Sequence, residues 1–182
     1  MQIAYQQGSS PSPSYIYGAG KSAAHEICKS IANNIGISLV WAYITNTYGV
    51  GENSPRLINN TLRYILHNQP LEFTEGKQNY DFVYITDVAY AFRLLAEKGL
   101  PNKGYVIGSG DAKPLHFFLE EIISLLKPIK KPVFGAIPYT GYMTPLSSFD
   151  ISELKKDCDY SPKISFSEGI LKTYNWLAGE RF

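Results

Sequence analysis

The sequence predicts an α/β fold with a few parallel strands, but not a complete doubly wound domain. The apolar run ISLVWAYI at residues 37–44 is short and β-branched near its ends, which is typical of a strand covered on both faces. Segments with helical periodicity alternate with strand-like runs along the chain. Only one or two strand–helix–strand units lie near the start, whereas a doubly wound sheet needs several units of roughly 30 residues each. We therefore expect a single truncated domain over residues 15–182.

The first regular element is predicted to be a long amphipathic helix. Residues 1–14 are rich in Gln, Ser and Pro and predict a loop. From residue 15 to residue 34, apolar side chains recur at spacings of three and four. Ser14 can cap the start of this helix and Gly36 can end it. The apolar positions are Ile16, Ala23, Ala24, Ile27, Cys28, Ile31 and Ile35.

Capping and terminating residues predict the helices that follow. Ser54 before Pro55 predicts the start of a helix that ends near His67. Thr86 can cap a second helix, and Gly99 can end it. Strands are predicted at residues 71–74, 81–85, 105–107 and 132–136. The remaining helices are predicted at residues 115–126, at residues 151–156, and from the capping box of Ser165 and Glu168 to about residue 177.

The composition excludes several classes of protein. Seventeen Lys and Arg residues against sixteen Asp and Glu residues leave a net charge of +1, so we expect no nucleic-acid partner. Cys28 and Cys158 stand far apart without further metal-binding partners, which favours buried, reduced thiols. No apolar run approaches 18 residues and no signal peptide is visible at the start, so we expect no membrane partner and a cytoplasmic location.

Tyr17 and Lys21 form the most distinctive local pair of residues that could carry chemistry. They are four residues apart in the first predicted helix, so both side chains lie on one face. An ammonium beside a phenol favours the ionised phenol, so Lys21 could make Tyr17 a usable acid and base. Such a pair is expected by chance in a chain with 14 tyrosines. The alternative is an ordinary surface pair of an aromatic ring and a cation.

Four motifs in order resemble one family over nearly the whole chain. They are PSYIYGAGK, ITNTYGVG, QNYDFVYITDVAYAF and GYVIGSG. Together they resemble the extended short-chain dehydrogenase/reductase family, the NAD-dependent sugar-nucleotide epimerases, dehydratases and reductases of carbohydrate metabolism. The resemblance covers only the C-terminal part of that family's Rossmann-type fold, with a small substrate-binding α/β subdomain. It implies oxidoreductase, lyase or isomerase chemistry with NAD or NADP and a nucleotide-sugar substrate.

The resemblance implies a role for individual residues. Tyr17 matches the catalytic tyrosine, which exchanges a proton with a sugar hydroxyl while hydride passes between sugar and nicotinamide. Lys21 matches the lysine that holds the nicotinamide ribose, so both residues belong to the catalytic and the cofactor-binding set. Ile44 and Thr45 would border the nicotinamide pocket. Asn46 matches a residue that lies against the sugar-nucleotide phosphates; read alone, it could equally be a turn residue at the end of a strand.

The sequence departs from the family at three positions where relatives often carry arginine. These positions hold Tyr43, Tyr80 and Thr140. Guanidinium groups bind diphosphates through paired hydrogen bonds, so their loss leaves the nucleotide and its binding strength open. Tyr80 could instead stack on a base or donate one hydrogen bond, and we count it as a substrate-binding residue.

Other conspicuous residues favour structural roles. We expect Asp87 to serve the start of the helix that follows it. The GSG sequence at residues 108–110 does not continue to GxGxxG and predicts a turn rather than a phosphate loop. The three histidines, which lack metal-ligand spacing, are His25, His67 and His116.

The family's glycine-rich dinucleotide fingerprint occurs nowhere in these 182 residues. Its catalytic Ser or Thr is also not recognisable. We therefore expect an incomplete cofactor site, a chain that is inactive alone, and association as a homodimer or with a complementing N-terminal half. Two alternatives remain: a non-catalytic remnant that binds a nucleotide sugar or a partner, and an unrelated α/β domain.

Overall fold

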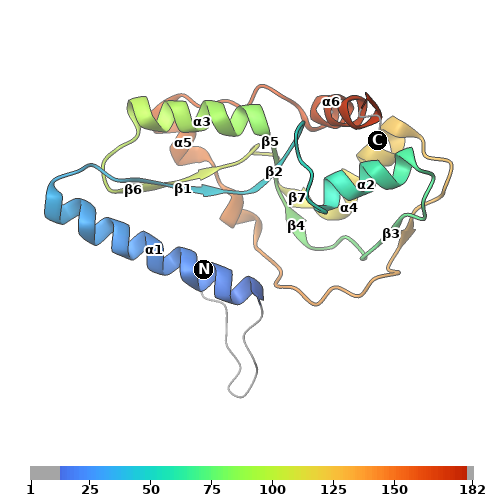
Figure 1. Ribbon diagram of the computed structural model, residues 1–182, viewed down its shortest axis with the longest axis horizontal. Helices are drawn as coiled ribbons and strands as arrows, with labels where there is room; N and C mark the ends of the chain where they lie inside the picture. Colours follow the sequence, from blue (N-terminus) through green and yellow to red (C-terminus); the bar gives the residue numbers. More distant parts are fainter. Residues whose placement is uncertain (1–12, 180–182) are drawn as a thin grey trace, which may run out of the picture. The chain divides into compact units, whose positions relative to one another are not determined.

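The computed structural model describes residues 13–179 of the chain, and Figure 1 shows their helices and strands. The chain divides into two compact units. The first comprises Met1–Trp41 and Leu100–Gly104, and the second comprises Ala42–Gly99 and Tyr105–Phe182. The predicted loop at residues 1–12 lies outside the described residues.

The first unit contains the long helix α1, Pro13–Ile35. Gly36 ends it as predicted, because its φ of +69° lies in the left-handed region that glycine adopts without strain. The amide of Ile37 then donates to the carbonyl of Ala32 at 2.9 Å. The helix includes Pro13 and Ser14, so the predicted loop is too long and Ser14 lies inside the helix rather than at its cap.

Much of the apolar stripe of α1 is exposed. The exposed fractions of its large aliphatic side chains are at least one half for Ile16, Ile27, Ile31 and Ile35. Cys28 is also exposed, so the expectation of a buried thiol is wrong there, although Cys158 is buried as expected. The periodicity predicted the helix correctly, because it reports which positions share a face and not whether that face is covered.

The strands of the described residues form short pairs. Strand β2 (Asn46–Tyr48) runs parallel to β5 (Phe82–Tyr84), and β3 (Glu72–Phe73) runs parallel to β8 (Val133–Phe134). The short strands β4 (Asn79–Tyr80) and β7 (Lys113–Pro114) pair antiparallel, and β1 (Val40–Ile44) pairs with β6 (Lys103–Ile107). The predicted parallel pairing is therefore present. Strands β3, β5 and β8 are shorter than predicted, whereas β6 begins two residues earlier than predicted.

Five α-helices complete the second unit, and most match their predicted positions. They are α2 (Leu57–Leu66), α3 (Ile85–Lys98), α4 (Leu115–Leu126), α5 (Ser152–Cys158) and α6 (Phe166–Gly179), with a short 3-10 helix at Leu146–Phe149. Figure 1 shows α6 beside α2, and α6 packs on both α2 and α4. The core between them is aromatic and aliphatic, with Tyr48, Phe82, Phe118 and Ile170 all buried. The capping box is present, since the amide of Glu168 donates to Ser165 Oγ at 3.2 Å.

Three local predictions differ from the structure. The run at residues 37–44 forms a strand only over Val40–Ile44, and its last two side chains, Tyr43 and Ile44, are half exposed instead of covered. Helix α2 begins at Leu57, because the carbonyl of Ser54 accepts the amide of Arg56 at 2.8 Å in a tight turn. Helix α3 begins at Ile85, so Thr86 lies inside its first turn, where it cannot be the cap.

Candidate functional site

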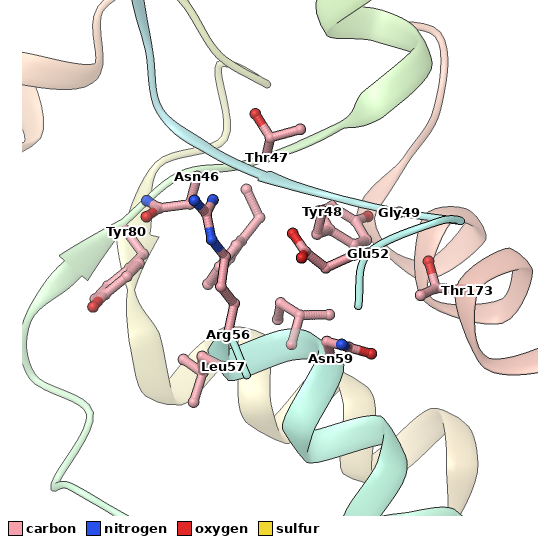
Figure 2. A pocket seen from close by; sticks show the side chains of 12 residues that line it. Asn46, Thr47, Tyr48, Gly49, Glu52, Arg56, Leu57, Asn59, Tyr80 and Thr173 are labelled. Atoms are coloured by element: carbon pink, nitrogen blue, oxygen red, sulfur yellow. The ribbon is translucent and has the colours of Figure 1, made fainter. Parts of the chain in front are cut away.

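The second unit encloses a cavity of about 390 Å³, within the range of roughly 300–1,000 Å³ that is usual for small-molecule sites. Strand β2, the turn after it, the start of α2, the β4–β5 segment and α6 supply its walls (Figure 2). The lining residues are Asn46, Thr47, Tyr48, Gly49, Glu52, Arg56, Leu57, Ile58, Asn59, Tyr80, Phe82 and Thr173.

The turn after β2 brings the polar side chains of the cavity together. Gly49 has a φ of +148°, and a Cβ there would lie 2.7 Å from Ile85 Cγ2, so the chain turns at the one residue type that fits. The turn then presents Glu52 before α2 begins. Ser54 donates its amide to Glu52 Oε1 at 2.9 Å, which fixes the carboxylate. Arg56 follows at the N-cap of α2.

Hydrogen-bond donors lie at one side of the cavity. Figure 2 shows the Arg56 side chain extending from the start of α2 toward strand β2, with Asn46 and Tyr80 on the same side. Within the described residues Arg56 forms no ion pair, so its guanidinium is available to an anion. Burial raises the pKa of Tyr80, and the nearby Tyr139 adds to the effect. Tyr80 therefore remains a protonated donor at neutral pH.

Hydrogen-bond acceptors lie at the other side. Ser54, beside the Glu52 carboxyl, holds the pKa of that carboxyl below its usual range, and Arg56 contributes a smaller effect in the same direction. Glu52 is therefore ionised at neutral pH. Asn59 and Thr173 lie on this side with Glu52, and both are almost fully buried (Figure 2).

Asp81 is a buried carboxyl that ties three segments together behind the cavity. Its Oδ2 accepts the Thr45 hydroxyl at 2.8 Å and the Ser109 amide at 2.9 Å, and its Oδ1 accepts the Ser109 hydroxyl. Its carbonyl accepts the backbone amide of Asn46 at 3.0 Å and Asn46 Nδ2 at 3.2 Å. A Cβ on Gly108 would collide with Asp81 Oδ2, so the GSG sequence forms a turn that fits around this carboxyl. Sequence reasoning did not single out Asp81.

The structure places the predicted site residues in different surroundings. Asn46 and Tyr80 both line the cavity. Ile44 is partly exposed and Thr45 is bonded to Asp81, and neither lines the cavity. Tyr17 and Lys21 lie on α1 in the first unit.

On α1, Tyr17 and Lys21 share one face. Lys21 Nζ lies 5.6 Å from the centre of the Tyr17 ring. The Tyr17 side chain is exposed. This geometry is compatible with an acid–base pair and with a surface aromatic–cation pair.

Sequence reasoning missed Glu52, Arg56 and Asn59 as site residues. The available signal was the dense run of polar residues in the turn between a strand and a helix, a common location for binding residues. That run shows nothing about which side chains turn inward, because this depends on how β2, α2 and α6 pack.

Other conspicuous residues have structural surroundings. The carboxylate of Asp87 is buried and accepts the amides of Lys163 and Ile164, each at 3.0 Å, which joins α3 to the segment before α6. Within residues 13–179, no cluster of three metal-binding side chains is present. Over the same range, no helix combines the length and the apolar character needed to span a bilayer.

Comparisons with known sequences point to one family. The sequence model of the NAD dependent epimerase/dehydratase family matches residues 2–108. The dTDP-D-glucose 4,6-dehydratase of Homo sapiens is 25% identical over 181 residues, which cover 94% of this chain and 51% of that protein. The dTDP-glucose 4,6-dehydratase of Haemophilus influenzae is 24% identical over 95% of this chain and 54% of that protein. The chain thus spans about half the length of the curated relatives it matches.

Solved structures share the fold. The dTDP-glucose 4,6-dehydratase of Bacillus anthracis, in complex with NAD, has a TM-score of 0.81 and 21% identity over 98% of this chain and 57% of that chain. The UDP-N-acetylglucosamine 4-epimerase of Methanobrevibacter ruminantium M1, in complex with UDP-N-acetylmuramic acid, has a TM-score of 0.80 and 22% identity over 98% of this chain and 58% of that chain. The predicted fold class, part of a Rossmann-type extended short-chain dehydrogenase/reductase, is confirmed.

Proposed function

Because the chain belongs to the NAD dependent epimerase/dehydratase family, we propose that it forms the substrate-binding part of a sugar-nucleotide epimerase, dehydratase or reductase. The observation that carries this proposal is the cavity of the second unit, in which Arg56, Asn46 and Tyr80 gather on one side. The Arg56 guanidinium forms no ion pair among the described residues, although it interacts electrostatically with Glu52. A guanidinium suits a phosphate group, because it can donate two parallel hydrogen bonds. Tyr80 adds a neutral donor where relatives often carry arginine.

The proposed chemistry uses Tyr17 and Lys21. NAD or NADP would accept and return the hydride when bound. Tyr17 would take a proton from a sugar hydroxyl through its phenol oxygen, and the Lys21 ammonium on the same helix face would contact the nicotinamide ribose. These residues fit only the nicotinamide end of the cofactor. The chain holds no glycine-rich turn for the pyrophosphate, so we assign no residue to that part.

Calorimetric titration of the chain with UDP-glucose and dTDP-glucose tests the binding proposal. We expect saturable binding of at least one of them and a 10- to 100-fold weaker Kd for Arg56→Ala, because a charge-assisted contact to phosphate is lost. Arg93→Ala is the matched control, since Arg93 on α3 is exposed and pairs only loosely with Glu97 at 3.8 Å. Equal binding by the Arg56 variant and the unaltered chain would contradict the assignment of the cavity.

The acid–base role of Tyr17 is tested in a chimera. The chain is joined to the N-terminal half of the human dTDP-D-glucose 4,6-dehydratase, and turnover of dTDP-glucose is followed. We expect Tyr17→Phe to lower kcat about 10²- to 10⁴-fold with little change in KM, because the proton transfer is lost and binding is not. Tyr64→Phe on α2, whose side chain is also exposed, is the control. A chimera that binds the sugar nucleotide but shows no turnover would favour the non-catalytic alternative.

A further inference from the structure

Asn59, a residue of the cavity wall, has a buried hydrogen-bond acceptor without a partner among the described residues. Its side chain is 3% exposed and lines the cavity near the start of α2 (Figure 2). Its Nδ2 donates to the carbonyl of Ser54 at 2.8 Å, which fixes the orientation of the amide. Among the described residues, no donor reaches Asn59 Oδ1. A buried acceptor without a donor is costly, so a donor from a ligand or a water molecule is expected there.

Two further acceptors lie on the same side of the cavity. The Thr173 hydroxyl donates its hydrogen bond to the carbonyl of Gly169 at 2.7 Å, so it can only accept a hydrogen bond from a ligand. Glu52 is ionised and can only accept. Figure 2 shows Glu52, Asn59 and Thr173 on the side opposite Asn46 and Tyr80. We call these three residues the acceptor end.

We propose that the acceptor end binds a donor-bearing part of the substrate, a hydroxyl or an N–H group, while the phosphates lie toward Arg56. This inference rests on the proposed function, since it orients a sugar nucleotide in the same cavity. The two ends differ in charge: Arg56 attracts an anion, and Glu52 repels one. A sugar nucleotide has the matching polarity, because its phosphates are anionic and both its sugar hydroxyls and its pyrimidine imide N–H are neutral donors.

Other occupants of the acceptor end fit less well. A phosphate or carboxylate would face the Glu52 charge and the acceptor oxygens of Asn59 and Thr173. A metal ion would need more ligands of the usual kinds than this end offers, since Glu52 is its only carboxylate and it holds no His or Cys. A bound water could also satisfy Asn59 Oδ1, and the test below distinguishes that case.

Removing the acceptor tests the inference by calorimetry on the full chain with UDP-glucose. We expect Asn59→Leu to weaken binding about tenfold, because leucine keeps a similar size and removes the amide oxygen. Asn60→Leu is the control: Asn60 is the adjacent residue, its Nδ2 donates at 3.3 Å to the carbonyl of Pro55, and it does not line the cavity. A thermal melt of each variant separates loss of binding from loss of folding.

Ligand variants on the unaltered chain identify the donor and do not depend on the folding of any variant. If the sugar hydroxyls bind the acceptor end, removing the glucose to leave UDP weakens binding. If the imide N–H binds there, UDP and UDP-glucose bind alike, and N3-methyl-UDP binds about tenfold more weakly than UDP.

Three outcomes would overturn the inference. The first is equal binding of UDP-glucose by Asn59→Leu and the unaltered chain, which would mean that Asn59 Oδ1 holds only water. The second is equal binding of UDP-glucose, UDP and N3-methyl-UDP by the unaltered chain. The third, no binding of any sugar nucleotide by the unaltered chain, would overturn the proposed function together with this inference.

Discussion

Asp81→Ala is expected to lower the free energy of unfolding by roughly 3 kcal/mol, because it leaves three partly buried donors without their acceptor. The residue is fully buried, and its carboxyl accepts the Thr45 hydroxyl and both the amide and the hydroxyl of Ser109. Alanine replaces none of these bonds, and it leaves empty the space beside Gly108 that the Asp81 carboxyl fills. Urea denaturation followed by circular dichroism measures the loss.

Asp159→Ala is the matched control for this prediction. Asp159 forms its ion pair with Lys98 at 2.8 Å, but its side chain is 83% exposed. An exposed pair of this kind contributes little to stability, so the control should unfold almost as the unaltered chain does. Equal unfolding free energies for the two variants would show that the network around Asp81 is not a main support of the fold.

The same network connects stability with the proposed substrate site. Asn46 is held by its backbone amide and its side-chain Nδ2, both of which donate to the carbonyl of Asp81. In the parallel pair of β2 and β5, Asn46 lies opposite Phe82, the residue after Asp81, so these bonds also support the register of the two strands. Alanine keeps this carbonyl but removes the carboxylate that holds Thr45, the residue before Asn46, so Asp81→Ala should disturb the wall of the cavity at Asn46 even where the chain still folds.

Elements with a strong local signal were predictable from the sequence. Helix α4 has the predicted bounds, because its sequence contains many apolar residues at helical spacing. Gly36 and Gly99 end their helices as predicted, but only Gly36 does so in the left-handed conformation, since Gly99 has a φ of −58°. The predicted caps of α2 and α3 were each wrong by two residues, because Ser54 forms a turn and Thr86 lies inside the helix.

The candidate site was only partly predictable, because its key contacts join distant parts of the sequence. Asn46 and Tyr80 were found through a family resemblance. Asp81 was missed because its partners, Thr45 and Ser109, stand 36 and 28 residues away, and no local pattern reports such a contact. Asn59 was missed because a polar residue inside a helix is usually taken as exposed, and only the packing of α2 on α6 buries it.

Gly169→Ala is expected to destabilise the second unit by about 1–3 kcal/mol, because an added methyl group would overfill the contact between α6 and the β2–β5 pair. The new Cβ would collide with the Tyr48 hydroxyl and lie 2.8 Å from Tyr48 Cζ and 2.9 Å from Tyr84 Cδ2. The Tyr48 ring has little freedom to move. Its hydroxyl donates to the carbonyl of Phe166 at 3.1 Å, and burial raises its pKa, so it keeps the proton that makes this bond.

The control for this prediction lies on the same helix. Gly179 is the last residue of α6, and a Cβ there would meet nothing within 4 Å. Gly179→Ala should therefore change the free energy of unfolding by less than about 0.5 kcal/mol. Thermal and urea unfolding of both variants measure the difference.

The effect of Gly169→Ala should extend from stability to binding. The Gly169 carbonyl accepts the Thr173 hydroxyl, so a shift of α6 at Gly169 moves one member of the acceptor end. We expect UDP-glucose binding by Gly169→Ala to weaken at temperatures where the variant is still fully folded, and binding by Gly179→Ala to stay unchanged. A destabilised Gly169 variant that binds UDP-glucose as tightly as the unaltered chain would show that the position of α6 does not control the acceptor end.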